Sequence, residues 1–157
     1  GETVRSHIKS IGEAVVGKTI DIANLNVYDL TVEPANEQEV EDTVYVMGGG
    51  DWNDWITHLS NQGLLANGVK TIAYTYVGGP TTEAIYRKGS MGKAKEDLEQ
   101  KANNMNEWLL RDYNGEALIS SSKAVVSKAS VFIPQMAIYV SCLFDTMMKY
   151  GTHETII

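Results

Sequence analysis

The chain has 157 residues, of which 43% are hydrophobic and 21% charged, a composition typical of one globular domain rather than a disordered or fibrous chain. Thirteen Lys and Arg against twenty Asp and Glu give a net charge of -7, which argues against nucleic-acid binding because a phosphate backbone needs clustered cations. No apolar stretch approaches the roughly 18 to 20 residues of a membrane span, the first ten residues lack the apolar h-region of a signal peptide, and the single Cys142 cannot form an intramolecular disulfide. We therefore expect a cytoplasmic location.

The first 35 residues predict an extended arm in which a hairpin can form. Short β-type runs, such as residues 26–32, are separated by Gly12, Gly17 and Pro34. The organisation predicted for the chain is an arm over residues 1–35, a helical hairpin insert over residues 36–62, and a sheet with its helices over residues 69–157.

Two helices joined by the run Gly48-Gly49-Gly50 are predicted within residues 36–62. Asn36 with Glu39 three positions later is a capping-box pattern, and apolar residues then recur at helical spacing. Asp51 is expected to cap the second helix, which ends near Gly63. The apolar face of that helix is Trp52, Trp55, Ile56 and Leu59, and we expect both tryptophans to anchor the core.

The same segment carries two features with a functional alternative. The acidic residues Glu37, Glu39, Glu41 and Asp42 are interpreted as a solvated face at the positive end of the helix dipole rather than as a metal site. The glycine run is interpreted as a turn between helices, because a dinucleotide-binding loop would follow a strand.

Strands and helices alternate in the rest of the chain. Residues 69–77 predict a strand, with Ile72, Tyr74 and Tyr76 on one face. The pattern continues with a long helix through residues 94–109, a strand over 117–120 and a helix over 136–147 with Pro134 in its first turn and its end at Gly151. This alternation predicts an α/β fold with a parallel sheet. Because a parallel strand needs neighbours on both edges, we expect these two strands to be part of a larger sheet.

Most common catalytic motifs are absent from the sequence. His7, His58 and His153 show no metal-ligand spacing to one another or to Cys142, so no metal site is expected. Cys142 lies in an apolar stretch and is interpreted as a small core residue rather than a nucleophile. No GxSxG elbow, GxGxxG or GxxxxGK[ST] occurs, so a main phosphate loop would lie outside this chain.

The segment from Tyr76 to Lys95 carries the strongest chemical signal. Tyr76 ends the strand at the carboxyl edge of the sheet, where open α/β sheets bind ligands, Tyr86 follows in the loop, and Lys95 lies at the start of the next helix. A nearby ammonium is expected to lower the pKa of the phenol and make it a proton donor to an enolate. On a continuous helix nine residues turn by about 900°, so Tyr86 and Lys95 can meet only if Gly89 and Gly92 break the backbone. An ordinary tyrosine and a solvated lysine are the alternative.

Several short motifs, taken in order, resemble those of one enzyme family. They are Val32-Glu-Pro-Ala, Val46-Met-Gly-Gly-Gly-Asp-Trp52, Ala73-Tyr-Thr-Tyr76, Ile85-Tyr86, Gly92-Lys-Ala-Lys95-Glu-Asp-Leu98, Lys123-Ala-Val-Val-Ser127-Lys-Ala-Ser130, Ile133-Pro134 and Lys149-Tyr-Gly-Thr-His-Glu154. With these motifs running through essentially the whole chain, the sequence closely resembles the trans-2-enoyl-CoA reductase and FabV-type enoyl-ACP reductase family.

The resemblance implies an NADH-dependent enzyme of fatty-acid synthesis that reduces the 2,3 double bond of an enoyl thioester of CoA or of an acyl-carrier protein. It also implies part of a short-chain-dehydrogenase-like Rossmann fold, a doubly wound parallel sheet. The matches to catalytic residues are Tyr86, Lys95 and Tyr76. The matches to residues beside the cofactor are Lys95, Lys123, Ser127, Ile133 and Pro134.

The chain departs from the family pattern at single residues and in extent. Gly50 stands where the family usually has glutamate, which is interpreted as a tolerated change in a turn. Ser127 stands where the family usually has threonine, a change that keeps the hydroxyl but leaves the choice between NADH and NADPH open. The amino-terminal cofactor-loop half of the Rossmann fold is missing. Since the chain also begins with Gly1 rather than Met, we expect it to work only with the remainder of the same polypeptide and to be inactive alone.

Two other functions stay open on the sequence alone. One is a catalytically inactive fragment or interaction module, for which the missing phosphate loop is the motive. The other is a module that binds acyl-CoA or an acyl carrier without redox chemistry. Only the apolar helix over residues 136–148 supports it, and methionines in such a helix more often pack in a core than line an acyl pocket.

Overall fold

The computed structural model describes residues 3–21, 23–122, 130, 133 and 135–155. They belong to two compact units. The first comprises Gly1–Glu13 and Pro34–Ala124, and the second comprises Ala14–Glu33 and Val125–Ile157. Within the described ranges no helix is both long enough and apolar enough to cross a membrane.

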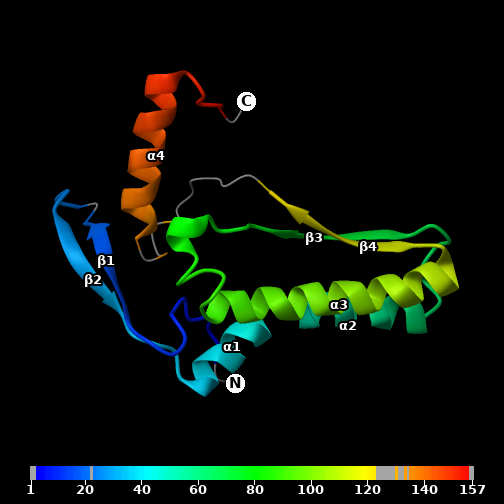
Figure 1. The fold of residues 1–157 in the computed structure, drawn as a ribbon. Helices are drawn as coiled ribbons and strands as arrows, with labels where there is room; N and C mark the ends of the chain where they lie inside the picture. Colours follow the sequence, from blue (N-terminus) through cyan, green and yellow to red (C-terminus); the bar gives the residue numbers. More distant parts are fainter. Residues whose placement is uncertain (1–2, 22, 123–129, 131–132, 134, 156–157) are drawn as a thin grey trace. The chain divides into compact units, whose positions relative to one another are not determined.

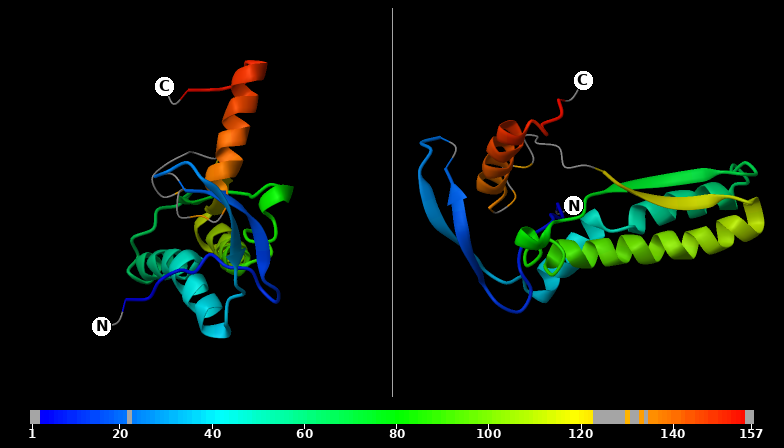
Figure 2. Two further views of the ribbon diagram at one scale, coloured as in Figure 1. Left: turned by 90° about the vertical axis from the view of Figure 1, so that its left-hand side faces the viewer. Right: turned by 45° about the horizontal axis from the view of Figure 1, so that its top comes forward.

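The first unit contains a parallel pair of strands covered by helices (Figure 1). Its elements are α1 (Glu37–Met47), α2 (Gly50–Asn61), β3 (Lys70–Thr75), the short 3-10 helix η1 (Pro80–Thr82), α3 (Ser90–Tyr113) and β4 (Glu116–Ser121). β3 and β4 pair in parallel from Lys70 opposite Glu116 to Thr75 opposite Ser121, and α3 connects them. Figure 1 and the right-hand view of Figure 2 show α3 running along both strands. The predicted α/β class with parallel strands is therefore confirmed.

One face of the β3–β4 pair is covered and the other is open. Thr71, Ala73 and Thr75 are partly buried, whereas Ile72 and Tyr74 on the opposite face are 48% and 75% exposed. The predicted alternation is confirmed, but the large apolar side chains lie on the exposed face. The small, partly polar side chains of the other face let α2 and α3 approach the strands closely.

The core of this unit lies between α3, α2 and the strands. Met105 and Leu109 of α3 are fully buried and cluster with Ala117 of β4. Side chains packed around them are Trp52, Ile56, Leu65, Val69, Trp108 and Tyr113. The apolar face predicted for the long helix is the one that α3 buries.

Two neighbouring leucines of α3 allow a matched test of this core. Replacing Leu109, which is fully buried, by alanine is expected to lower the free energy of unfolding by about 2 to 5 kcal/mol, because a cavity forms between α3 and the strands. Replacing Leu110, which is 58% exposed, should cost less than about 0.5 kcal/mol. Urea unfolding of the intact protein measures both changes. Equal losses for the two variants would contradict the assignment of the buried face.

The first helical turn follows its sequence signal. Asn36 Oδ1 accepts from the N–H of Glu39 at 2.9 Å, and Glu39 Oε2 accepts from the N–H of Asn36 at 3.0 Å, which completes the predicted capping box. Lys9 of the N-terminal segment also donates to Glu39, at 2.5 Å. This ion pair and the solvent-exposed Asn36–Glu39 cap together fix the start of α1.

The glycine run forms the predicted turn, but the predicted cap of α2 is wrong. Gly49, not Asp51, is the N-cap residue, and its N–H donates to the Asp97 carboxylate of α3 at 2.9 Å. A Cβ at Gly49 would lie 2.9 Å from the Cβ of Lys101 and 3.0 Å from the Cα of Leu98. The turn is therefore set by close approach to α3, and a carboxylate from another helix replaces the local cap.

The two tryptophans of α2 differ. Trp52 packs against the core, and its indole N–H donates to Thr71 Oγ1 at 2.8 Å. Trp55 is 61% exposed, so the prediction that both tryptophans anchor the core is wrong for this residue. Three residues turn a helix by about 300°, which rotates Trp55 out of the buried stripe that contains Trp52 and Ile56.

The described residues of the second unit form a hairpin and one helix. β1 (Val15–Ile20) pairs antiparallel with β2 (Val27–Val32), so a hairpin does form in the predicted arm, and α4 (Met136–Tyr150) packs against β1. Gly17 lies within β1, so the prediction that it separates two β-type runs is wrong. A Cβ there would overlap the side chain of Gln135. Gly151 ends α4 at a φ of 64°, as predicted, whereas Pro134 lies outside the described residues.

Cys142 does not occupy a core position. Its side chain is exposed, and no residue of α4 is buried, so the prediction of a small core cysteine is wrong. Among the described residues of this unit, β1 covers only part of the apolar surface of α4. An apolar stretch shows that a helix can be buried, but it does not identify a partner.

Candidate active site

The candidate site lies where β3 ends and α3 begins. After Thr75 the chain passes through Tyr76, the short η1 helix and a turn over residues 83–88 that carries Tyr86. α3 then starts at Ser90, and its second turn carries Lys95. The carboxyl end of a parallel strand and the start of the following helix meet at one edge of a sheet, which is where α/β folds place reactive groups.

A break in the backbone brings Tyr86 and Lys95 together. Gly89 has an extended conformation, with φ of -97° and ψ of -167°, so Tyr86 lies outside α3 and Lys95 inside it. Lys95 Nζ lies 5.0 Å from the centroid of the Tyr86 ring and donates to Thr75 Oγ1 at 2.7 Å. The predicted break is thus confirmed at Gly89. It is wrong for Gly92, which lies within α3.

The electrostatics of the pair differ from the expectation. Burial, with a smaller contribution from Tyr76, raises the pKa of Tyr86 above its usual value of 10.0. The predicted lowering by Lys95 is therefore wrong, because the ammonium faces the ring and loss of solvent dominates. Burial and the Arg87 charge lower the pKa of Lys95, and the Glu99 carboxylate opposes this. At neutral pH Tyr86 keeps its proton and remains a hydrogen-bond donor.

Glycines allow the turn to approach its neighbours. A Cβ at Gly92 would overlap the carbonyl oxygen of Arg87, so the turn rests directly on the first turn of α3. A Cβ at Gly78 would lie 3.0 Å from Cδ1 of Tyr86, which places the Tyr86 ring against the strand exit. The absence of side chains at both positions makes the position of Tyr86 possible.

The N-terminal segment fastens the break itself. Ser90 is fully buried, and its N–H donates to the carbonyl of Lys9 at 3.0 Å. Its hydroxyl donates to the carbonyl of His7 and accepts from the N–H of Lys9 at 3.1 Å. Thr43 of α1, also fully buried, accepts from the N–H of His7 at 2.9 Å. The start of α3 is therefore held by α1 through this segment.

Comparison with known proteins identifies the family. The family described as trans-2-enoyl-CoA reductase catalytic region matches residues 1–157. The chain belongs to this family. It is 46% identical over 154 residues to an enoyl-[acyl-carrier-protein] reductase [NADH] of Flavobacterium johnsoniae and 45% identical to a trans-2-enoyl-CoA reductase [NADH] of Clostridium perfringens. Each alignment covers 98% of this chain and 39% of the relative, so the chain spans about two fifths of their length.

Solved structures of the reductase family share this fold. A trans-2-enoyl-CoA reductase of Clostridium acetobutylicum in complex with NADH superposes with a TM-score of 0.89 at 40% identity, covering 99% of this chain and 39% of that one. A Treponema denticola trans-2-enoyl-CoA reductase in complex with NAD gives 0.85 at 42% identity, covering 96% and 37%.

Only some of the residues predicted to lie beside the cofactor of this reductase-family chain are among the described residues. Lys123, Ser127 and Pro134 lie outside the described residues, and their roles stay predictions. Ile133 belongs to the second unit, where its N–H donates to the carbonyl of Ser130 at 3.2 Å.

Three further residues of the site were not predicted. Thr75 holds the Lys95 ammonium, and Arg87 is bound to Glu99 of α3. Thr75 had a signal, because it is the last strand residue on the face opposite Tyr76. Arg87 and Glu99 had none, because they are twelve positions apart and meet only across the Gly89 break.

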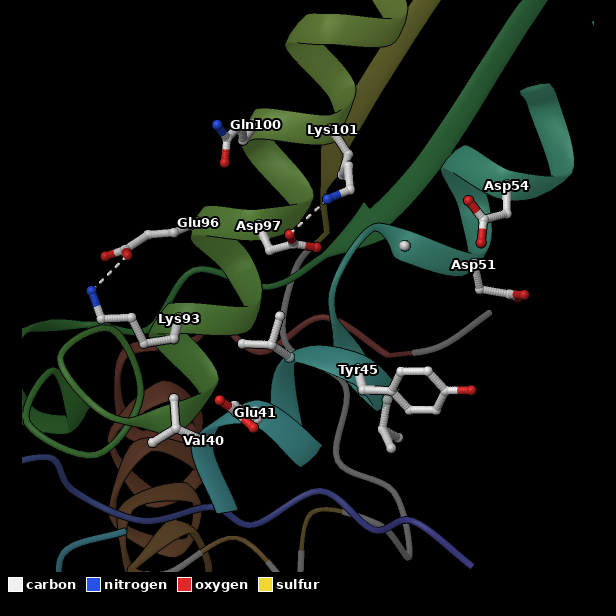
Figure 3. Close-up of a pocket in the computed structure, with 13 residues that line it drawn as sticks. Val40, Glu41, Tyr45, Asp51, Asp54, Lys93, Glu96, Asp97, Gln100 and Lys101 are labelled. Carbon is white, nitrogen blue, oxygen red and sulfur yellow. Dashed lines mark hydrogen bonds and ion pairs between the residues drawn. The ribbon is translucent and has the colours of Figure 1, made fainter. Parts of the chain in front are cut away.

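A separate groove of about 870 Å³ lies between α1, the start of α2 and α3 (Figure 3). Its charged lining residues are Glu41, Asp51, Asp54, Lys93, Glu96, Asp97 and Lys101. Ion pairs along α3 neutralise both lysines, at 2.8 and 3.0 Å, which leaves carboxylates in excess. None of the predicted site residues lines this groove, and its charge disfavours phosphate-bearing ligands.

Proposed function

We propose that the protein containing this chain reduces the 2,3 double bond of trans-2-enoyl thioesters of CoA or an acyl-carrier protein, with NADH as reductant. The observation that carries the proposal is the Lys95 ammonium, which faces the Tyr86 ring while bound to Thr75 at the strand end. The reductase names and NADH complexes of the relatives support it. A cytoplasmic location fits this chemistry.

The residues present fit the nicotinamide-ribose end of NADH, which supplies the hydride when bound. An ammonium has three N–H donors, and one of those of Lys95 is directed to Thr75 in the described part of the chain, so others can bind ribose hydroxyls. The sequence contains no GxGxxG loop for the pyrophosphate. We infer that Lys123, Ser127, Ile133 and Pro134 assist at the cofactor, and that the remainder of the polypeptide supplies the phosphate loop.

Tyr86 and Lys95 would supply the acid chemistry of the reduction. Negative charge develops on the thioester oxygen as the double bond is reduced, and a hydrogen bond from the protonated Tyr86 hydroxyl stabilises it. The Lys95 ammonium adds positive charge beside the ring and favours the enolate further. Tyr76, at the strand exit, is proposed as a second tyrosine of the site.

The open face of β3 and β4 agrees with a larger enzyme. Ile72, Tyr74 and Leu118 are 48%, 75% and 41% exposed on a sheet that has two strands among the described residues. We propose that the rest of the polypeptide extends this sheet into a short-chain-dehydrogenase-like doubly wound fold, with the chain forming its incomplete catalytic portion.

The test is an assay of the intact protein. Oxidation of NADH should require a trans-2-enoyl-CoA and should not occur with the saturated acyl-CoA of equal length. The product should be that saturated thioester. Binding of enoyl-CoA without oxidation of NADH would instead support the acyl-binding module, and the absence of both would support the inactive fragment.

A further inference from the structure

The residue that follows Tyr86 is joined to α3 by a two-point ion pair. Arg87 Nη1 donates to Glu99 Oε1 at 2.8 Å, and Nη2 donates to Glu99 Oε2 at 3.0 Å. This fork-to-fork arrangement fixes orientation as well as distance, and a lysine cannot reproduce it. Glu99 lies four residues after Lys95, on the same face of α3. The ion pair therefore links the neighbour of Tyr86 to the helical turn that follows Lys95.

Among the described residues, the turn that carries Tyr86 is hydrogen-bonded to α3 through the Arg87 side chain. Its own hydrogen bonds are internal, from the N–H of Tyr86 to the carbonyl of Thr82 and from the N–H of Arg87 to that of Glu83. The Gly89 break removes helical hydrogen bonding across the junction. Two contacts of Arg87 cross to α3 instead, its carbonyl against Gly92 and its side chain to Glu99.

The ion pair is half exposed, so its effect on the position of Tyr86 can be measured apart from its effect on the stability of the fold. The side chains of Arg87 and Glu99 are 43% and 48% exposed, and ion pairs at such exposure contribute little to the free energy of unfolding. The same pair adjoins the candidate site in the chain, because Arg87 follows Tyr86 and Glu99 lies one helical turn after Lys95, and both charges affect the pKa of Lys95. Removing it should change the geometry and charge of the site more than the stability of the fold.

We propose that the Arg87–Glu99 ion pair is a positioning device that sets the separation of Tyr86 and Lys95. The proposal rests on the proposed function, because it assigns to the pair the task of holding the acid group in its working geometry. The described hydrogen bonds of the two side chains join them to each other, so neither is proposed as a proton donor to the substrate. Arg87 acts on the position of the turn that carries Tyr86, and Glu99 holds Arg87 from the turn of α3 that follows Lys95.

The test compares Glu99→Gln, Arg87→Gln and the exchange Arg87→Glu with Glu99→Arg in the intact protein. We expect kcat to fall about 10- to 100-fold in each single variant, because small displacements of a reacting group carry losses of this size. The exchange should recover a large part of kcat. In a crystal structure of the Glu99→Gln variant, the distance from Lys95 Nζ to the Tyr86 ring should exceed the 5.0 Å seen here.

The pH profile adds a readout that a purely structural role would not move. The charged and titratable groups around Lys95 are Arg87 and Tyr86 of the turn, Glu99 of α3 and Tyr76 after β3. Glu99→Gln removes a charge that favours the ammonium, so the alkaline loss of activity should move to lower pH. Arg87→Gln removes a charge that disfavours it, so this loss should move to higher pH.

A matched control is Glu116→Gln, which breaks the ion pair between Lys70 and Glu116 at the opposite end of the strands. We expect wild-type kcat for this variant and a shift of the unfolding midpoint similar to that of Glu99→Gln. Wild-type kcat and an unchanged Tyr86–Lys95 distance in the Glu99→Gln variant would overturn the positioning role while leaving the reductase function intact. If the wild-type protein reduces no enoyl thioester, the proposed function fails, and the crystallographic distance alone decides the positioning.

Discussion

Replacing Tyr86 by phenylalanine is expected to lower kcat for the reduction of trans-2-enoyl-CoA about 10²- to 10⁴-fold in the intact protein. The substitution removes only the hydroxyl, which is the hydrogen-bond donor proposed for the thioester oxygen. The ring that faces Lys95 remains, so the ammonium should keep its bond to Thr75. Steady-state rates of NADH oxidation measure the loss, and a fluorescence titration should show NADH affinity unchanged within about twofold.

Two other tyrosines near the strand exit make this experiment discriminating. Tyr74→Phe is the control, because Tyr74 lies on the face of β3 opposite Thr75, which binds Lys95, and this variant should retain wild-type turnover. Tyr76→Phe tests the second candidate. If Tyr86→Phe kept full activity and Tyr76→Phe lost it, the proton donor would be Tyr76, and the geometry of the Lys95 pair would have a different purpose.

Local patterns predicted the elements well because their causes are local. The capping box of Asn36 and Glu39 depends on four consecutive residues, and the structure contains both of its hydrogen bonds. The helix that ends at Gly151 and the break at Gly89 depend on glycine in the same way. For the candidate site, this was sufficient to predict that Tyr86 and Lys95 could meet.

The misses depend on contacts between distant residues. Asp51 was expected to cap α2, but a carboxylate from α3, Asp97, binds the N–H of the N-cap residue Gly49. Trp55 and Cys142 were expected in the core because they are apolar, yet no packed partner covers either of them in the described residues. The burial of a side chain depends on the element that packs against it, and the periodicity of a helix does not identify that element.

The pKa of Tyr86 shows the same limit in the chemistry. The sequence places an ammonium near the phenol, which predicts a lower pKa, but it gives neither the burial of the hydroxyl nor the direction from which Lys95 approaches. In the structure burial dominates and raises the pKa. The role of proton donor survives this correction, since a phenol with a raised pKa is protonated over a wider range of pH.

Replacing Gly92 by alanine is expected to reverse the usual rule for helices. In a helix interior alanine is ordinarily more favourable than glycine by about 1 kcal/mol. Here the new Cβ would overlap the carbonyl oxygen of Arg87, which is backbone and cannot rotate away. The turn that carries Tyr86 would have to move off α3, so we expect the free energy of unfolding to fall by about 1 to 3 kcal/mol and kcat to fall at least about tenfold.

The control for this substitution is Gly50→Ala in the first turn of α2. A Cβ at Gly50 has no neighbouring atom within 4 Å, so alanine should be neutral or stabilising by up to about 1 kcal/mol and should leave kcat unchanged. Urea unfolding and steady-state rates measured on both variants separate helix propensity from the contact with the turn. If Gly92→Ala were as stable and as active as Gly50→Ala, the turn would not rest on α3, and the position of Tyr86 would need another cause.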